Sequence, residues 1–343
     1  LSALQHAMNL WIRDPVAFAS EFQNDPVSAQ QDTQEERLTA EDLLQPERMT
    51  SLARYAVPLA ANVVTAFIDV QKRVLYYVVV AWEDGFTGQV IDYGTFPDQR
   101  MTYFVLRKVK RTLADLLPRA GEESAIYQGL EALEDQLRTR VWKRDDGAEM
   151  RLNRLVIDAG WMTDLVHRFC REGTSSSIII PSHGKYVGAR NRPFSEYKRK
   201  RGDRLGHHWR IPAVTGARRN RHLMFDTNYW KTFVHARLKT PVGDRGALSF
   251  FESVRGHRMI AEHLTAETFV RVEAQASGRV VDEWKLPVAG ADNHLFDCLV
   301  GCAVGASMEG ITLAEAGATA TRRKPRKSKG LSLAERRALK RGR

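Results

Sequence analysis

Three aspartates in the 343-residue sequence stand where buried strands end or where a buried helix begins, and this pattern is typical of a metal site. Asp69 lies at the end of the β-branched apolar run "NVVTAFIDV", and Asp158 ends the apolar run in "RLNRLVIDAG". Asp297 falls in the first turn predicted for the apolar stretch after "ADNH". Catalytic groups of α/β sheets gather beyond the carboxyl ends of the strands. Hard divalent cations such as Mg²⁺ take carboxylate oxygens as ligands, so the three side chains predict a site for such ions.

The predicted last helix carries small residues that would bring its aspartate to the other two. Asp297, Gly301 and Gly305 recur every four residues and therefore share one face of the helix. A face of small residues lets a helix approach a sheet closely. We therefore expect Asp297 to meet Asp69 and Asp158 at the strand ends.

Each of these residues also has a plain structural interpretation. A single aspartate at a strand end is more often a turn or cap residue, although three together weaken that interpretation. Asp292 is predicted to be the N-cap of the last helix. His294 shares the helical face of Asp297, but a lone histidine in a first turn is more often an ordinary polar residue. A zinc set of His294, Cys298 and Cys302 has no second ligand pair with finger-like spacing, so packing cysteines are favoured.

The elements that must position these residues follow from changes in hydrophobic period. Three successive strands are predicted first, then two helices between Gln99 and Arg140 that break near Pro118 and Gly121. A strand ending at Asp158, a helix that stops at Gly173 and a short buried strand come next. The remaining predictions are a polar, basic loop, a strand, a helix, a hairpin and the last helix, over residues 183–221, 222–227, 228–238, 267–287 and about 293–308.

This order of elements predicts an α/β fold in three parts. Residues 1–60 mix short helical patterns with polar loop and are predicted to be a linker or arm. Residues 61–310 hold the predicted sheet and helices, and residues 311–343 form a basic tail that we do not expect to fold. The chain begins with Leu1 rather than Met, so we expect a piece of a longer protein.

The net charge of +11 is concentrated in two short regions. Residues 318–343 and residues 185–221 each carry about +10, which leaves the rest of the chain near −9. Such a distribution suits a polyanionic partner, although charged runs are also common on ordinary solvated surfaces. The candidate nucleic-acid contacts in the second region are Lys198, Arg199, Lys200, Arg201, Arg218 and Arg219.

Other sequence features exclude several classes of protein. The three cysteines are too few and too unevenly placed for a disulfide framework, which indicates a reducing compartment. No run of 18 apolar residues and no secretory leader is present, so neither a membrane span nor secretion is predicted. The motif "GxxxxGK[ST]" is also missing, and we do not expect a nucleotide-driven motor within these residues.

Residues 10 to 310 resemble the nuclease domain of the phage terminase large subunit, in its lambda-type (GpA) branch. The resemblance rests on "VTAFIDVQKRVLYYVVVAWEDG" followed by "IDYG", on "VIDAG" leading into a helix, on "DTNYWKTFVHARL" and on "NHLFDCLVGCAV". The stretch "DPVAFASEFQNDPV" is similar to the family's segment between its ATPase motor and its nuclease. The motor lies upstream in the family and is missing here, and the region 185–221 matches no general family pattern.

The resemblance implies a ribonuclease H-like mixed sheet flanked by helices, in which acidic residues bind two Mg²⁺ or Mn²⁺ ions and cut concatemeric viral DNA. On that basis Asp69, Asp158 and Asp297 are the metal-binding acids, and His294 matches a histidine beside the metals in some relatives. The implied partners are double-stranded DNA, the small terminase subunit and the portal, in the cytoplasm of a bacterial host. Two alternatives stay open: an inactive ribonuclease H-like module that binds DNA or a partner, and a resolvase or transposase on the same fold.

Overall fold

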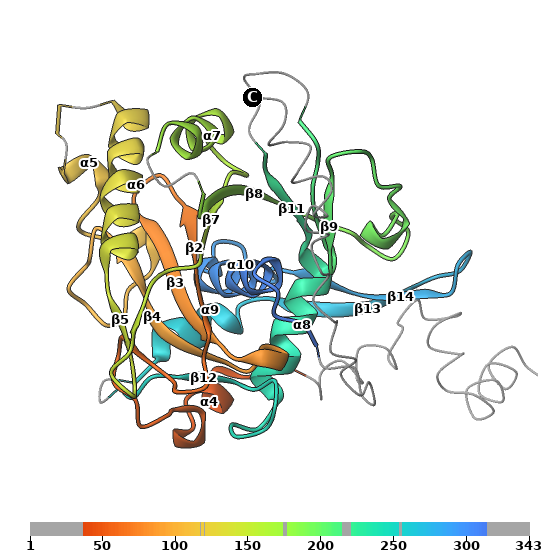
Figure 1. The fold of residues 1–343 in the computed structure, drawn as a ribbon, viewed down its shortest axis with the longest axis horizontal. Coiled ribbons are helices and arrows are strands. Elements are labelled where there is room, and N and C mark those ends of the chain that lie inside the picture. The colour runs from red at the N-terminus through yellow and green to blue at the C-terminus, as the bar shows by residue number, and fades with distance from the viewer. Residues whose placement is uncertain are drawn as a thin grey trace, which may run out of the picture. The chain divides into compact units, whose positions relative to one another are not determined.

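The computed structural model describes residues 37–313, except 117, 120, 174–176, 215–220 and 254–255 (Figure 1). Most of the predicted arm and nearly all of the basic tail therefore lie outside the described residues. The division into arm, nuclease domain and tail stays a prediction. Within the described part, residues 37–60 include the helix α4 (Ala40–Leu43), and Leu43 is fully buried in the core.

The core of the described chain is a nine-stranded sheet with the order β12-β4-β3-β2-β7-β8-β11-β10-β9. The strands β2, β3 and β4 form the predicted antiparallel meander. β7 then pairs in parallel with β2, and β8 pairs in parallel with β7. The central strands β2 and β3 are buried along their whole length, as their continuous apolar sequences predict. These five strands are β2 (Val63–Val70), β3 (Leu75–Trp82), β4 (Gly88–Phe96), β7 (Arg154–Asp158) and β8 (Ile179–Lys185).

Shorter strands extend this sheet at both edges and form two small sheets beside it. The basic region 183–221 is not all loop, because its chain doubles back as β9 and β10 and pairs with β11. A small sheet and the predicted hairpin complete the set. The strands are β9 (Arg204–Gly206), β10 (Trp209–Ile211), β11 (Leu223–Asp226) and β12 (Leu248–Phe250) in the main sheet, β1 (Ala56–Val57), β5 (Trp142–Arg144) and β6 (Glu149–Met150) in the small sheet, and β13 (Thr268–Ala274) and β14 (Arg279–Lys285) in the hairpin.

Helices cover both faces of the main sheet (Figure 1). Alternate side chains of β2 enter different cores: Phe67 packs with α8 (Thr227–Lys239), α9 (Arg258–Leu264) and α10 (His294–Met308). Ile68 packs with α6 (Glu122–Thr139) and α7 (Thr163–Glu172) on the other face. The α/β class and the ribonuclease H-like mixed sheet flanked by helices are thus confirmed.

The helix predicted from Gln99 to the break near Pro118 is wrong for most of its length. The structure has only a 3-10 turn, η3 (Leu106–Lys108), and the short helix α5 (Leu113–Leu116) in this region. Side chains bind the backbone that a helix would use. The Arg73 guanidinium donates to three carbonyls between residues 106 and 109, and the Gln99 side chain bonds the amides of residues 110 and 111. No helix in the described part of the chain is long and apolar enough to cross a membrane.

Candidate functional site

Asp69 and Asp158 occupy corresponding positions in neighbouring strands. β2 and β7 run parallel, with Phe67 opposite Val156 and Ile68 opposite Ile157, so the next residue on each strand is an aspartate. Side chains alternate between the faces of a sheet. Phe67 and Val156 both enter the core beneath α10, and the two aspartates therefore face the same helix.

The helix α10 approaches β2 as closely as the small-residue face predicts. A Cβ atom on Gly301 would lie 1.8 Å from the Phe67 ring, so only glycine fits without a shift. One residue further, the Thr65 hydroxyl donates to the Cys302 carbonyl at 2.9 Å. Gly305 is not required in this way, because its added Cβ would be 3.5 Å from Thr65. The close approach brings the first turn of α10, with Asp297, to the ends of β2 and β7.

Asp69 and Asp297 lie close enough to Asp158 for their charges to affect its ionisation. The pKa of Asp158 is raised to about 7, first by burial, then by the charge of Asp69 and, more weakly, by that of Asp297. Such like charges resist joint ionisation unless a cation balances them. As they stand, however, no three His, Cys, Asp or Glu side chains in the described residues are arranged to hold a metal ion.

His294 is the first residue of α10 and bonds one of the three acids. Its Nδ1 atom lies 2.8 Å from Oδ2 of Asp69, and its ring stacks on Tyr76 with 4.5 Å between the ring centroids. Burial lowers the pKa of His294, but the bond to Asp69 and the charges of Asp69, Asp292 and Asp297 raise it more, so the net shift is upward. The histidine and Asp69 therefore form a buried, polar pair.

Asp297 has partners that the sequence analysis did not identify. The Lys231 ammonium from α8 lies 3.0 Å from Oδ1 of Asp297 and 2.5 Å from Oε1 of Glu267. Asn293 donates to both carboxylates, at 2.6 Å to Glu267 and 3.2 Å to Asp297. Burial lowers the pKa of Lys231, but the two carboxylates raise it more, so the lysine is held charged. The apolar neighbours of Lys231 in "NYWKTF" are the one signal that it lies on a buried face.

The start of α10 and its cysteines were also predicted from the sequence. The N-cap is Asn293 rather than Asp292, because Oδ2 of Asp292 instead accepts the Leu106 amide at 2.6 Å. Cys298 and Cys302 pack as predicted, since both are fully buried and direct their thiols at backbone carbonyls of β3.

Four of the six predicted nucleic-acid contacts lie within the described residues. Lys198, Arg199, Lys200 and Arg201 are exposed on the loop before β9, where the Lys200 amide donates to the Asp203 carboxylate at 2.8 Å. Arg218 and Arg219 lie outside the described residues. The contribution of these six residues to binding stays a prediction.

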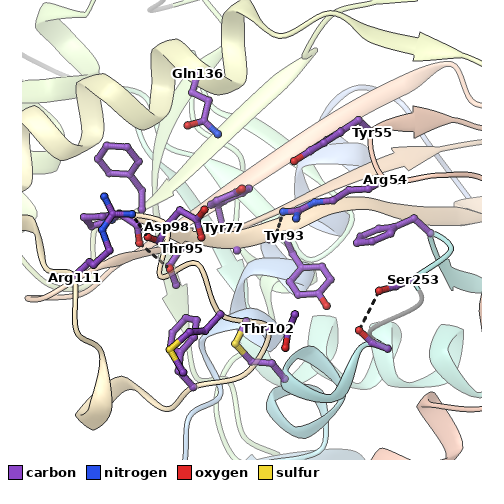
Figure 2. A pocket seen from close by; sticks show the side chains of 18 of the residues that line it. Arg54, Tyr55, Tyr77, Tyr93, Thr95, Asp98, Thr102, Arg111, Gln136 and Ser253 are labelled. Atoms are coloured by element: carbon purple, nitrogen blue, oxygen red, sulfur yellow. Dashed lines mark hydrogen bonds between the residues drawn. The ribbon is translucent and has the colours of Figure 1, made fainter.

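A cavity of about 670 Å³ beside the end of β4 is distinct from the acidic site. Figure 2 shows Arg54, Tyr77 and Tyr93 on one of its sides and Arg111 beside Asp98 on another. Arg54 donates to the buried carboxylate of Asp92 at 2.7 Å. Neither the three site aspartates nor His294 lines this cavity. This cavity is therefore not part of the candidate site.

Comparisons with known proteins identify related chains. A family described as the endonuclease domain of the terminase large subunit gpA matches residues 19–316. The nuclease domain of the large terminase subunit gp2 of bacterial virus Sf6 is 13% identical, with 77% of this chain and 96% of that chain covered and a TM-score of 0.39. A lysine-to-alanine mutant of that domain with manganese is 14% identical, with 71% and 88% covered and a TM-score of 0.38. No curated protein matches the sequence.

Proposed function

Because this chain belongs to the endonuclease-domain family of the terminase large subunit gpA, we propose that it is a metal-dependent endonuclease that cuts concatemeric viral DNA during genome packaging. The observation that supports the proposal is that Asp158 lies near enough to Asp69 and Asp297 for both of their charges to raise its pKa. The three aspartates come from three elements far apart in the sequence, and each lies at or next to one end of β2, β7 or α10. A module that only binds DNA has no need of three neighbouring acids.

The side chains present fit divalent ions by their chemistry. Asp69, Asp158 and Asp297 offer carboxylate oxygens, the ligands that Mg²⁺ and Mn²⁺ prefer. Burial, and then the charge of Asp69, raise the pKa of Asp158 to about 7. Two bound ions would activate a water molecule and stabilise the leaving 3′ oxygen of the phosphodiester. We assign the three aspartates as the residues that hold them.

The other side chains of the site orient these acids. His294 fixes one oxygen of Asp69, and Gln71 donates to both oxygens of the same carboxylate at 3.1 Å. Lys231 and Asn293 hold Asp297 in place and join it to Glu267. In the proposed reaction His294 also accepts or donates a proton, because histidine is the side chain whose ordinary pKa lies near neutral pH.

The proposed setting follows from the family. We propose double-stranded DNA as the substrate, the small terminase subunit and the portal as partners of the longer protein, and the cytoplasm of a bacterial host as the compartment. A second candidate is an inactive module that binds DNA or a packaging partner. It is favoured by one observation: Asp69 and Asp297 are already bonded to His294 and Lys231 within the protein.

A plasmid-cutting assay separates the two candidates. We expect nicking or cutting of duplex DNA with little sequence preference in Mg²⁺ or Mn²⁺, and none in EDTA. Asp69→Asn should remove nearly all cleavage and retain DNA binding, since the amide keeps the side-chain volume and deletes a metal-binding charge. The matched control is Asp244→Asn, which changes an exposed loop aspartate. Full turnover of Asp69→Asn, or no cutting at any metal concentration, would support the inactive module.

A further inference from the structure

A groove of about 400 Å³ opens at the end of the sheet opposite to the aspartates. Arg154, at the start of β7, and Met308, at the end of α10, both line it, whereas Asp158 and Asp297 lie at the other ends of the same elements. The groove exists because β11 begins only at Leu223, opposite Ser182. Residues 179–181 of β8 therefore have no β11 residue beside them, and the sheet is open there.

Four arginines surround this opening, and we call it the arginine groove. They are Arg154, Arg171, Arg204 and Arg221, from four different parts of the chain. None of the lining residues in the described chain is acidic. Arg154 is fixed by the Glu309 carboxylate at 2.6 Å and by the Ser177 carbonyl at 3.1 Å. Arg204 and Arg221 are exposed at the opening, where solvent can reach their side chains.

Three histidines lie close together beside the arginine groove. His167 lies one turn before Arg171 on α7, and His222 directly follows Arg221. Nε2 of His167 is 3.2 Å from Nε2 of His183, and the rings of His183 and His222 are 5.3 Å apart. Burial lowers the pKa of His183 to about 4, with further lowering by His222, His167 and Lys185. An added positive charge is therefore disfavoured at His183.

We propose that the arginine groove binds the phosphodiester backbone of double-stranded DNA at a distance from the point of cleavage. The choice of DNA as the anion rests on the proposed function, whereas the preference for phosphate rests on the groove itself. A guanidinium group can donate two parallel hydrogen bonds to the oxygens of one phosphate, and it stays charged at any physiological pH. Arg154 stands four residues from Asp158 along one strand, about 13 Å at ~3.3 Å per residue. A backbone in the groove thus lies about four nucleotides from the aspartates, at about 3.4 Å per nucleotide of one strand.

The test neutralises the two exposed arginines and measures DNA affinity without cleavage. The double variant Arg204→Gln/Arg221→Gln is compared with the wild type for binding of a labelled duplex in EDTA at several salt concentrations. Each phosphate that the protein no longer neutralises lowers the slope of log affinity against log salt by about 0.9, so we expect a decrease of about 1.8. The matched control is Arg119→Gln/Lys143→Gln, which removes two exposed charges outside the groove and should keep the wild-type slope.

Two further measurements test whether DNA contacts the groove and whether the double variant is folded. In the wild-type protein, adding the duplex should shift the imidazole NMR signals of His222 and His183, and thermal melting of the double variant should match that of the wild type. If the salt slope is unchanged and the imidazole signals do not shift, the proposal is wrong. An acidic protein partner would then be the expected ligand of the groove. The proposed function can fail independently of this proposal. If the protein cuts no DNA in Mg²⁺ or Mn²⁺ but the double variant shows the lowered slope, the assignment of the groove stands and the nuclease activity does not.

Discussion

At the level of single residues, the site combines carboxylates that repel one another with side chains that tie them down. Asp158 has its pKa raised to about 7 by burial and by neighbouring acids, whereas Asp69 and Asp297 each have a nitrogen partner within 3.0 Å. A metal ion that enters must replace these partners or share the carboxylates with them. His294 and Asp297, one turn apart, therefore have different duties.

The relative effects of two substitutions test this difference. Asp297→Asn removes a proposed charged ligand, and we expect cleavage to decrease by more than about 100-fold. His294→Ala removes a partner that orients Asp69, for which losses of about 10- to 100-fold are usual. Initial rates with plasmid DNA at saturating Mg²⁺ measure both. Equal losses would make His294 a full ligand, and an unaffected His294→Ala would make it an ordinary first-turn residue.

The acids and His294 could be proposed from the sequence, but the partners Lys231 and Glu267 could not. Asp69 and Asp158 end apolar runs that form strands on sequence grounds alone, and a four-residue repeat of small side chains marks the face of Asp297. Lys231 and Glu267 come from α8 and from the residue before β13, and nothing local places them beside Asp297. Their contact depends on how α8 crosses α10, which is a property of the packed core.

At the level of elements, the contact between α10 and β2 determines where Asp297 lies. Gly301 packs directly on the Phe67 ring, while Gly305, one turn later, has room for a methyl group beside Thr65. The two glycines look alike in the sequence and share one helical face. Their surroundings make them unequal in importance, which gives a matched pair of variants.

Gly301→Ala should destabilise the protein by about 1–3 kcal/mol, because the added methyl group overlaps a buried ring. It should also lower cleavage, since α10 moves away from β2 and carries Asp297 with it. Gly305→Ala should be neutral or slightly stabilising, as alanine favours a helix over glycine. Urea unfolding and plasmid cleavage measure the two effects. If Phe67→Leu fails to restore the stability of Gly301→Ala, the assigned overlap is not the cause.

A buried histidine supports the start of α10 and makes stability depend on pH. Nδ1 of His263 accepts the Leu295 amide at 3.3 Å, so its proton is on Nε2. Burial, and then the charge of His294, lower the pKa of His263 to about 3. Its unfolded value is 6.5, so the folded state loses stability as the pH falls from 6.5 towards 3.

Replacing this histidine should remove that part of the acid sensitivity. In His263→Asn the loss of unfolding free energy between pH 7 and pH 5 should be smaller by about 2 kcal/mol than in the wild type. Urea titrations at the two pH values measure it, and all other titrating groups are shared by both proteins. An identical pH dependence would show that His263 is protonated normally in the folded state.

Helices and strands were easier to predict where buried side chains set the hydrophobic period of the sequence. They were harder to predict where side chains form hydrogen bonds with backbone groups. The strands β2, β3 and β7 and the helix α10 follow from apolar runs and lie within a few residues of the predictions. Residues 99–112 have a helical period, but Arg73 and Gln99 use the backbone groups of that segment for their own hydrogen bonds. Those contacts join parts of the chain up to 36 residues apart, and no local pattern contains them.

At the level of the whole molecule, the positive charge is concentrated in two sequence regions on an otherwise acidic chain. The region 185–221 contributes Arg204 and Arg221 to the arginine groove, so its charge has a defined place in the fold. The predicted contacts Lys198 to Arg201 are exposed on a loop of the same region. The tail, residues 318–343, lies outside the described residues, and its role rests on composition. The two regions should therefore affect DNA binding in different ways.

Deleting residues 318–343 should weaken binding to all duplexes alike, because a segment with eleven Lys and Arg and one Glu contacts phosphates without reading bases. The salt slope should decrease by about 0.9 for each phosphate that the tail had neutralised, and cleavage at saturating DNA should stay near normal, since the proposed metal ligands are retained. Affinities of the full and truncated chains for two unrelated duplexes, each at two salt concentrations, measure the effect. We expect the tail and the arginine groove to neutralise separate phosphates, so the deletion and Arg204→Gln/Arg221→Gln should lower the slope additively. An unchanged slope after deletion would assign the tail to a protein partner of the packaging machinery instead.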